Sequence, residues 1–257
     1  MDPTRGSARP LREQIADKLR QLITNGELQP GDRLSPEEVL AEQYKVSRQT
    51  IRAALQDLTA EGLLMASRGR GRIVRAYKPL TWHISRYESR HHHEEAGDPG
   101  EDQWSTDVRA QGREPRQDVK VEIVEPPAHV ADLLGVGPDE LVVVRRRIRY
   151  VDEVPYQLAD SYFRETLVQG TPLMQPRDVY APGGVLASLG HIQTRYVEDL
   201  VVRMPTKGEK TQLGLPAGTP VAELTRTGYD TDGKPLRVMV TIAPGDRHRF
   251  RWELDPT

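Results

Sequence analysis

The chain has 257 residues, which is long for one hydrophobic core and comfortable for two. Its hydrophobic fraction of 37% and charged fraction of 29% are typical of a soluble globular protein, and no apolar run of about 18 residues is present to span a bilayer. The sequence contains no cysteine for disulfides, and its first residues lack the pattern of a secretory signal. We therefore expect two domains and a cytoplasmic protein.

The formal net charge of -2 hides an asymmetry between the two parts of the chain. Residues 1–77 contain 13 Lys and Arg against 10 Asp and Glu, whereas residues 78–257 contain 23 against 28. A basic N-terminal part indicates a polyanionic partner, although solvated charge is the more common explanation of such a difference.

Two helices are predicted at the start of the first part. Apolar residues recur at helical spacing over residues 11–23, and Asn25-Gly26 follows as a stop signal because glycine accepts the left-handed conformation at a helix end. The stretch Ser35-Pro36-Glu37-Glu38 predicts the start of a second helix that runs to about Tyr44, with Ser35 as the cap and an acidic residue completing a capping box.

A third helix is predicted from Ser47, which can cap it, to Gly62, which can end it. Its separation from the second helix is the short one that a helix-turn-helix needs to project its second helix into a major groove. Four residues of its first turn can reach base edges and phosphates, because they lie off the buried stripe: Arg48, Gln49, Thr50 and Arg52. An ordinary solvated helix terminus explains these four residues about equally well on their own.

A wing is predicted directly after the third helix. Residues 63–65 and 73–74 read as two short strands, and the loop between them is rich in arginine and glycine. Arg68, Arg70 and Arg72 supply cations without an intervening carboxylate, while a glycine such as Gly71 lets the backbone lie close to a sugar-phosphate edge. A flexible basic hairpin tip is the alternative, which the position after a helix-turn-helix disfavours.

These motifs resemble the GntR family of bacterial regulators over the whole first domain. The resemblance is carried by Pro10-Leu11, by Gly26-Glu27-Leu28-Gln29-Pro30-Gly31-Asp32-Arg33-Leu34, by Val46-Ser47-Arg48 and by Gly69-Arg70-Gly71. It implies a winged helix-turn-helix over residues 1–77 that binds double-stranded operator DNA as a homodimer on an inverted repeat. It also implies DNA contacts from the first turn of the third helix and from Arg70-Gly71.

One position departs from the family pattern. The family usually reads Leu-Pro-Ser-Glu-Arg before the second helix, whereas this chain reads Leu34-Ser35-Pro36-Glu37-Glu38. Glu38 therefore stands where an arginine often contacts DNA. We expect the affinity or the operator preference to differ for this reason.

The second part is predicted to be α+β with a mainly antiparallel sheet. It begins with an irregular stretch through Trp82 and Trp104. The predicted elements that follow are strands at 119–123, 141–151, 155–163, 192–204, 221–227 and 236–243, with short helices at 130–134 and 207–215. Hairpin turns are predicted near Asp152-Glu153 and Asp232-Gly233-Lys234.

This order of elements is similar to the UTRA effector domain of the HutC-type branch, and the arginine-rich style is similar to actinomycete members. Arg147-Ile148-Arg149, Gly214-Leu215-Pro216 and Gly233-Lys234-Pro235 carry the resemblance. It implies a chorismate-lyase-like domain over residues 78–257, a homodimer interface, and a cleft for a small, often anionic or sugar-like effector. We assign no cofactor.

Three arginines alternate along the strand 141–151 and so share one face of it: Arg145, Arg147 and Arg149. Such a row is costly without anions or carboxylates opposite. Because a guanidinium fork suits carboxylate or phosphate, we predict an anionic effector held by Arg147 and Arg149, with Ser161 donating from the next strand. A ladder of salt bridges with residues such as Glu198 or Glu223 is the alternative, and for Arg145 it is about as good.

Two further positions bear on the effector. Many relatives carry a glutamate two residues before the serine, where this chain has Ala159, and another glutamate at the position of Arg237. Sugar recognition loses an acceptor at each place. We therefore assign Arg237 to the effector site and expect an effector unlike the amino-sugar phosphates or imidazole compounds of better-known relatives, or none at all.

The histidine cluster invites a metal site, because imidazole and carboxylate bind zinc. His91-His92-His93-Glu94-Glu95 lies in a polar stretch, however, and such clusters are more often surface loops, so we assign no metal.

The predicted function is a DNA-binding regulator, a repressor released by a small molecule. An enzyme of the chorismate-lyase-like fold is one alternative, but the sequence has no nucleophile elbow, zinc motif, phosphate loop or cysteine, and we assign no catalytic residue. A nonspecific architectural DNA binder is the other, and it predicts a chain that is basic throughout.

Overall fold

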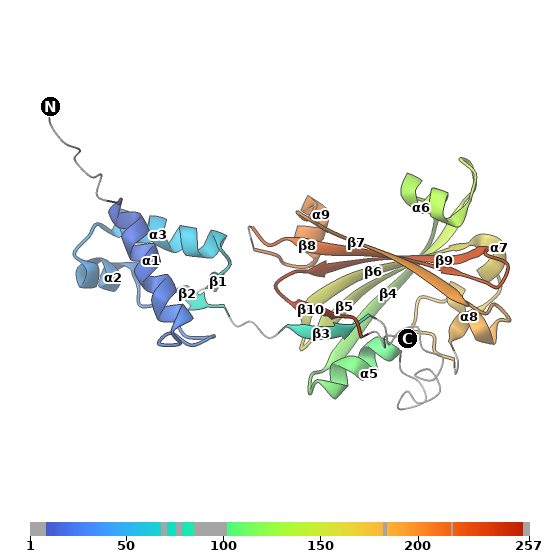
Figure 1. Ribbon diagram of the computed structural model, residues 1–257, viewed down its shortest axis with the longest axis horizontal. Helices are drawn as coiled ribbons and strands as arrows, with labels where there is room; N and C mark the ends of the chain where they lie inside the picture. Colours follow the sequence, from blue (N-terminus) through green and yellow to red (C-terminus); the bar gives the residue numbers. More distant parts are fainter. Residues whose placement is uncertain are drawn as a thin grey trace. The chain divides into compact units, whose positions relative to one another are not determined.

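The computed structural model describes residues 9–67, 71–75, 79–84, 102–181, 184–216 and 218–253 (Figure 1). The chain forms two compact units. The first comprises Met1–Lys78 with Leu215–Thr219, and the second comprises Pro79–Gly214 with Pro220–Thr257. Within the described ranges, no helix combines the length and the apolar character that crossing a bilayer would require.

The first unit contains the three helices and the hairpin that the sequence predicts. Its elements are α1 (Leu11–Thr24), α2 (Glu37–Tyr44), α3 (Arg48–Ala60), β1 (Leu64–Ser67) and β2 (Gly71–Val74). One face of each helix is buried in a common core, which includes Ile15, Leu19, Leu40, Ile51, Leu55, Leu58, Leu64 and Val74. The helical periodicity of the apolar residues therefore correctly predicted which faces are buried.

The two predicted helix caps have opposite outcomes. Ser47 caps α3, because its Oγ accepts a hydrogen bond from the backbone N–H of Thr50 at 3.1 Å. The predicted capping box at Ser35 is wrong, since α2 begins at Glu37 and Pro36 occupies the cap position without a side-chain hydrogen bond. Ser35 is one residue too early, and Glu38, the acidic residue of the predicted box, contacts Arg48 of α3 instead.

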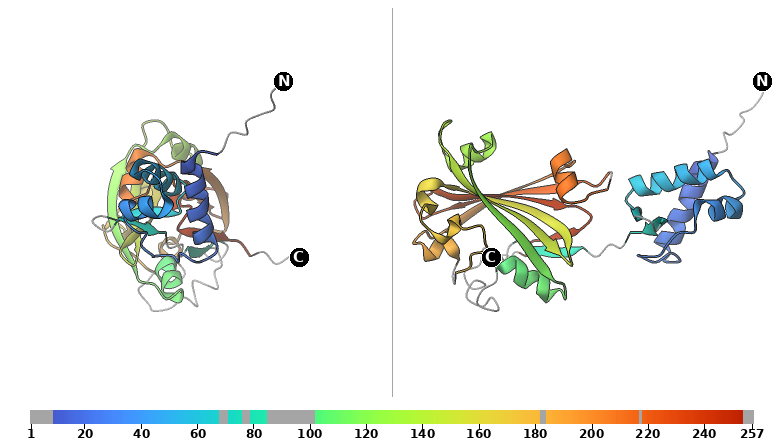
Figure 2. Two further views of the ribbon diagram at one scale, coloured as in Figure 1. Left: turned by 90° about the vertical axis from the view of Figure 1, so that its left-hand side faces the viewer. Right: turned by 180° about the vertical axis from the view of Figure 1, so that it is seen from behind.

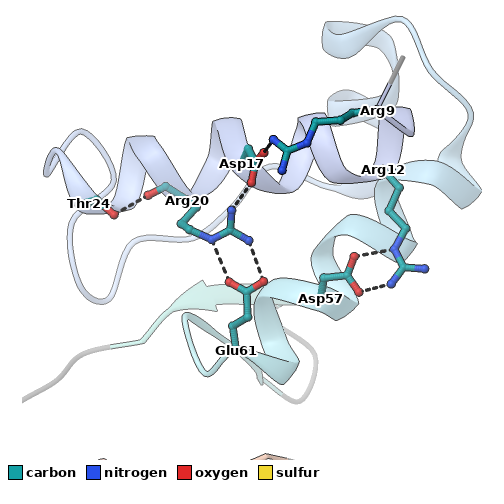
Figure 3. Close-up of polar contacts among 7 residues, drawn as sticks. All are labelled: Arg9, Arg12, Asp17, Arg20, Thr24, Asp57 and Glu61. Atoms are coloured by element: carbon teal, nitrogen blue, oxygen red, sulfur yellow. Dashed lines mark hydrogen bonds and ion pairs between the residues drawn. The ribbon is translucent and has the colours of Figure 1, made fainter. Parts of the chain in front are cut away.

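Ion pairs join α1 to α3 at the surface of the core (Figure 3). Arg20 donates to both carboxylate oxygens of Glu61, at 2.9 and 2.7 Å, and Arg12 forms the same two-fold contact with Asp57. Arg20 also contacts Asp17 on its own helix. These bonds fix the position of α3 relative to α1.

The second unit is built on one antiparallel sheet of six strands, in the order β4-β5-β6-β9-β8-β7. The strands are β4 (Pro115–Val124), β5 (Val142–Val151), β6 (Val154–Arg164), β7 (Arg195–Arg203), β8 (Val221–Tyr229) and β9 (Pro235–Pro244). β5 turns into β6 through Asp152 and Glu153, whose positive φ angles of 50° and 60° match the tight hairpin turn that the right-handed twist of strands favours. The structure confirms the predicted α+β class.

Two elements lie where the sequence predicts only an irregular stretch. β3 (Leu80–His83) pairs in parallel with β10 (His248–Arg251), which lies at the other end of the chain. Helix α5 (Gln103–Ala110) is capped by Asp102, whose side chain accepts from the backbone N–H of Ser105 at 2.9 Å. A four-residue strand with a distant partner has too little local pattern to be predicted.

Alternation along β5 divides its side chains between the two faces of the sheet. Val142 and Val144 pack with α6 (Ala128–Leu134), whereas Val143 packs on the other face with Leu173 and Leu186. That second face is covered by short elements, which are α7 (Glu165–Val168), the 3-10 turn η2 (Pro172–Met174) and α8 (Val185–Ser188). Figures 1 and 2 show α6 on one side of the sheet and α5 on the other. α9 (Lys207–Gln212) precedes β8.

Candidate DNA-binding surface and effector cavity

The predicted recognition residues lie together at the start of α3. Arg48, Gln49 and Arg52 line a shallow surface depression with Ala53 and Gln56. The side chains of Arg48 and Arg52 are 56% and 51% exposed, so both are free to meet a large ligand.

The fourth predicted recognition residue, Thr50, has a second partner in the helix cap. Its hydroxyl lies 2.8 Å from that of Ser47, so it takes part in the cap as well as in the exposed turn.

Two carboxylates of α2 hold the arginines of this surface. Glu37 accepts from Arg52 at 3.0 Å and from Arg48 at 3.4 Å, and Glu38 contacts Arg48 at 2.7 Å. The hydrogen bond from Arg52 is the largest cause that lowers the pKa of Glu37 below its usual value. Glu38, the position at which the sequence departs from the expected family pattern, therefore contacts the first residue of α3.

The wing is described only in part. Gly71 begins β2 at a φ of 77°, a value that glycine adopts without strain. Arg72 donates to the Thr59 hydroxyl at 2.6 Å and to the Leu55 carbonyl at 3.4 Å, so it joins β2 to α3. Arg68 and Arg70 lie outside the described residues.

The second unit encloses a cavity of about 390 Å³ on the face of the sheet covered by α8. Five arginines line it, contributed by three strands: Arg145, Arg147, Arg149, Arg226 and Arg237. Two carboxylates, Asp102 and Asp178, and an apolar wall complete it. The wall includes Trp82, Trp104, Phe163, Leu173, Tyr180, Leu186, Tyr196 and Met239.

Arg145 holds a covering segment in place. Its guanidinium donates to the carbonyls of Leu173, Gln175 and Arg177 at 2.5, 2.9 and 2.7 Å. It makes no ion pair among the described residues, and burial lowers its pKa.

The predicted ladder with Glu198 or Glu223 is therefore wrong. Glu198 pairs with Arg226, and Glu223 pairs with Arg203. Both glutamates lie on β7 or β8, and β6 and β9 separate these strands from β5.

Arg149 is neutralised within the cavity. It donates to Asp102 at 2.9 Å, and its guanidinium lies 4.9 Å from the centre of the Trp104 ring. Burial alone raises the pKa of Asp102, but Arg149 and the hydrogen bond from Ser105 bring it below its usual value. The pair is thus a charged one.

Arg147 and Arg237 have no carboxylate partner among the described residues. Arg147 makes one hydrogen bond, to Ser161 Oγ at 3.2 Å, and its Nε has no partner. Burial, and then repulsion by Arg149 and Arg145, lower the pKa of Arg147 to about 9. Arg237 makes no hydrogen bond in the described part of the chain, and burial lowers its pKa as well.

Three of the four predicted effector residues, Arg147, Arg149 and Arg237, thus line one cavity. The fourth, Ser161, is fully buried beneath Arg147 and accepts from it rather than lining the space.

Sequence reasoning missed several residues of the cavity. Asp102 and Trp104 belong to α5, for which the signal was an aspartate three residues before Ser105, the spacing of a helix cap. The available signal for Arg226 was its position on the same face of β8 as Ala222 and Leu224, where an arginine is unusual. The histidines 91–93 lie outside the described residues, and within those residues no group of three or more ligating side chains could hold a metal ion.

The two units correspond to two known sequence families. Residues 11–74 match the model of the bacterial regulatory proteins of the gntR family, and residues 110–249, more than half of the chain, match the UTRA domain. The chain therefore belongs to the GntR family of regulators with a UTRA domain.

Relatives that match nearly the whole chain are transcription regulators. The uncharacterized HTH-type transcriptional regulator SCO4628 of Streptomyces coelicolor is 30% identical over 96% of this chain and 92% of its own. The HTH-type transcriptional repressor NagR of Bacillus subtilis is 26% identical over 99% of both chains. The crystal structure of PhnF from Mycobacterium smegmatis, at 22% identity, shares the fold with a TM-score of 0.55 over 96% of this chain and 100% of that one. The protein is a DNA-binding transcriptional regulator.

Proposed function

We propose that the protein is a repressor that binds an inverted-repeat operator as a homodimer and leaves it when a small anion occupies the cavity of the UTRA domain. The observation that carries the proposal is the pair Arg147 and Arg237, two cations inside the domain without a carboxylate partner among the described residues. A buried cation is costly unless it is paired, so an anion that enters stabilises the domain.

The DNA contact is proposed for the exposed side of α3. Arg48 and Arg52 project there beside Gln49, and arginine suits the paired acceptors of guanine whereas glutamine suits adenine. Arg68 and Arg70 are proposed to contact phosphates from the wing, with Gly71 at its base. The name of the relative NagR supports repression as the direction of control.

The homodimer is proposed to form through β7. This outer strand exposes several large apolar side chains, which are Val197, Leu200, Val201, Val202 and, just beyond it, Met204. An outer strand with unpaired backbone groups and an apolar surface is a template for a second chain. A second copy of β7 would pair with the backbone groups and cover the apolar side chains.

Binding of the purified protein to the DNA upstream of its own gene tests the first part. At about 0.15 M salt we expect a protected inverted repeat and an affinity of about 10⁻⁸ M or tighter, against a scrambled duplex that binds far more weakly. Equal binding to both duplexes contradicts sequence-specific recognition at this site.

Matched variants at the two edges of the sheet test the dimer. Val202→Glu places a charge on β7, and Ile123→Glu places the same charge at an exposed position of β4, the opposite edge. We expect sedimentation to give a monomer for the first variant and a dimer for the second. A dimer in both cases places the interface elsewhere.

A further inference from the structure

The hydrogen-bonding groups of the cavity define the chemical class of its ligand, if the effector binds there as proposed above. Three groups that can only donate are unsatisfied, as Arg147 Nε, Arg237 Nε and Trp104 Nε1 are buried and have no partner among the described residues. Arg147 and Arg237 both line the cavity, so an anion there would meet guanidinium groups that no carboxylate of the described residues neutralises.

The two carboxylates of the cavity already accept hydrogen bonds from the protein. Asp102 accepts from Arg149 and from the Ser105 backbone, and Asp178 accepts from Gln117 at 2.6 Å and from the backbone of Val179 at 3.0 Å. Each hydroxyl or ammonium group of a ligand needs a free acceptor when it is buried. The carboxylates have only part of their capacity left for a sugar or an amine, and the amide oxygen of Gln103 is a further acceptor without a partner among the described residues.

Most of the remaining wall is apolar, although Gln103, His191 and Gln193 interrupt it. Phe163, Leu173 and Leu186 belong to a buried cluster, and Trp82, Trp104 and Met239 extend the apolar surface. A volume of about 390 Å³ holds a small molecule of the size that ligand pockets of roughly 300–1,000 Å³ accept. A body that buries apolar surface is stabilised there, whereas a ring with many hydroxyls would leave most of them without partners.

From these observations we propose that the ligand is an organic anion with an apolar, planar body: a carboxylate or phosphate that meets Arg147 and Arg237, on a body that packs between Trp104 and the Phe163 side of the wall. We expect polyhydroxylated anions and neutral apolar molecules to bind more weakly than this class. It rests on the proposed effector role of the cavity.

Calorimetric titration of the full-length protein with four probes tests this class. 2-Naphthoate supplies the apolar body with a carboxylate, 2-naphthamide the same body without charge, glucose 6-phosphate a hydroxylated anion, and inorganic phosphate the anion alone. We expect 2-naphthoate to bind at least about tenfold more tightly than any of the other three, because each of them lacks either the charge or the apolar surface.

Adjacent positions of β5 provide the matched variants. Arg147→Met removes the cation from the cavity, whereas Arg146→Met removes one from the opposite face, where Arg146 pairs with Glu122 and Asp160. Arg147→Met should weaken 2-naphthoate binding by about tenfold or more and leave thermal stability unchanged or higher, and Arg146→Met should retain the binding. Arg237→Met is the second cavity variant, with the same expectation as Arg147→Met.

The outcomes separate this inference from the proposed function. Tighter binding of glucose 6-phosphate that depends on Arg147 overturns the apolar body but keeps an anionic effector in the cavity. Equal binding of 2-naphthoate and 2-naphthamide overturns the anion in both proposals. No binding of 2-naphthoate up to about 1 mM overturns the class, and the operator footprint of the same preparation then reports whether the regulator itself is intact.

Discussion

Arginines contribute to both proposed sites, the DNA-binding surface and the effector cavity, but their surroundings differ. On the DNA-binding surface, Arg48 and Arg52 are more than half exposed and rest on the carboxylates of Glu37 and Glu38. In the cavity, Arg147 and Arg237 lie inside the domain without such a partner in the described part of the chain. An exposed ion pair contributes little and can exchange its carboxylate for a phosphate at small cost, whereas an unpaired internal cation is costly until an anion arrives.

The difference indicates two uses of the same side chain. In the proposed mechanism, the surface ion pairs orient the guanidinium groups for DNA, and water and salt screen the energy of these pairs. The unpaired cavity arginines would raise the free energy of the empty domain, and an anion that binds would lower it. Four predictions test this comparison.

The largest effect is expected from removing both arginines of the DNA-binding surface. Arg48→Ala with Arg52→Ala should weaken operator binding by about 100-fold or more, because each bidentate base contact contributes about 1–3 kcal/mol. Electrophoretic mobility shift at fixed salt measures the loss. Arg116→Ala on β4 is the control, since this exposed arginine and its partner Glu153 both belong to the second unit. Full operator affinity in the double variant would contradict base recognition by α3.

The second effect concerns acid stability and His248 in the effector domain. Burial lowers the pKa of His248 to about 4, from 6.5 in the unfolded chain. The unfolded chain therefore binds more protons between pH 6.5 and 4, and the free energy of unfolding falls as the pH falls through this window, by up to about 3 kcal/mol at pH 4.

Denaturant unfolding at a series of pH values measures this slope. His248→Phe should flatten it whatever its effect on stability at neutral pH, because a phenyl ring does not titrate. His129→Phe, the same substitution at an exposed histidine of α6, is the control. An unchanged slope in His248→Phe assigns the acid sensitivity to the carboxylates. All seven histidines follow residue 77, so the effect belongs to the second part of the chain.

The third effect tests the departure at Glu38. Glu38→Arg removes the carboxylate beside Arg48 and adds a cation to the DNA-binding surface. We expect DNA affinity to rise about tenfold at about 0.15 M salt, and the slope of log affinity against log salt to steepen by about 1, as one more phosphate contact predicts. Glu27→Arg makes the same charge change after α1; an equal gain there shows only a general effect of charge.

The smallest effect is expected at the ion pairs that join α1 to α3. Arg20→Ala should lower the free energy of unfolding by less than about 1 kcal/mol, since the pair with Glu61 is about one third exposed, and molar salt should reduce the difference further. A double-mutant cycle with Glu61→Ala measures the coupling. A larger, salt-independent loss shows that Arg20 acts through packing rather than charge.

The first domain was predictable from sequence because its contacts are local. The apolar spacing of residues 11–23 and the stripe of Ile51, Leu55 and Leu58 predicted its core, and Ser47 its cap. The error at Ser35 is a shift of one residue, since Pro36 has the extended backbone (φ -50°, ψ 150°) of the cap position that was expected of Ser35. Glu37 and Glu38 were visible in sequence, but their contacts with α3 were not.

In the second domain, sequence predicted the strands and the shared face of Arg145, Arg147 and Arg149, because alternation is a property of a single strand. Which partners those arginines meet was not predictable. Glu198 was a reasonable partner by charge, yet it lies four strands from β5. The acid that does meet Arg149 is Asp102, at the start of a helix that sequence did not indicate.

By itself, then, the sequence determined the family, the three helices of the first unit, the strands of the six-stranded sheet and the presence of unusual positive charge, since all of these depend on neighbours along the chain. The tertiary structure alone decided that Asp102 neutralises Arg149 whereas Arg147 and Arg237 have no carboxylate partner among the described residues. The physical reason is that pairing of β5, β8 and β9 in one sheet joins residues distant in sequence, and charge is satisfied or left unpaired only by what that pairing brings near.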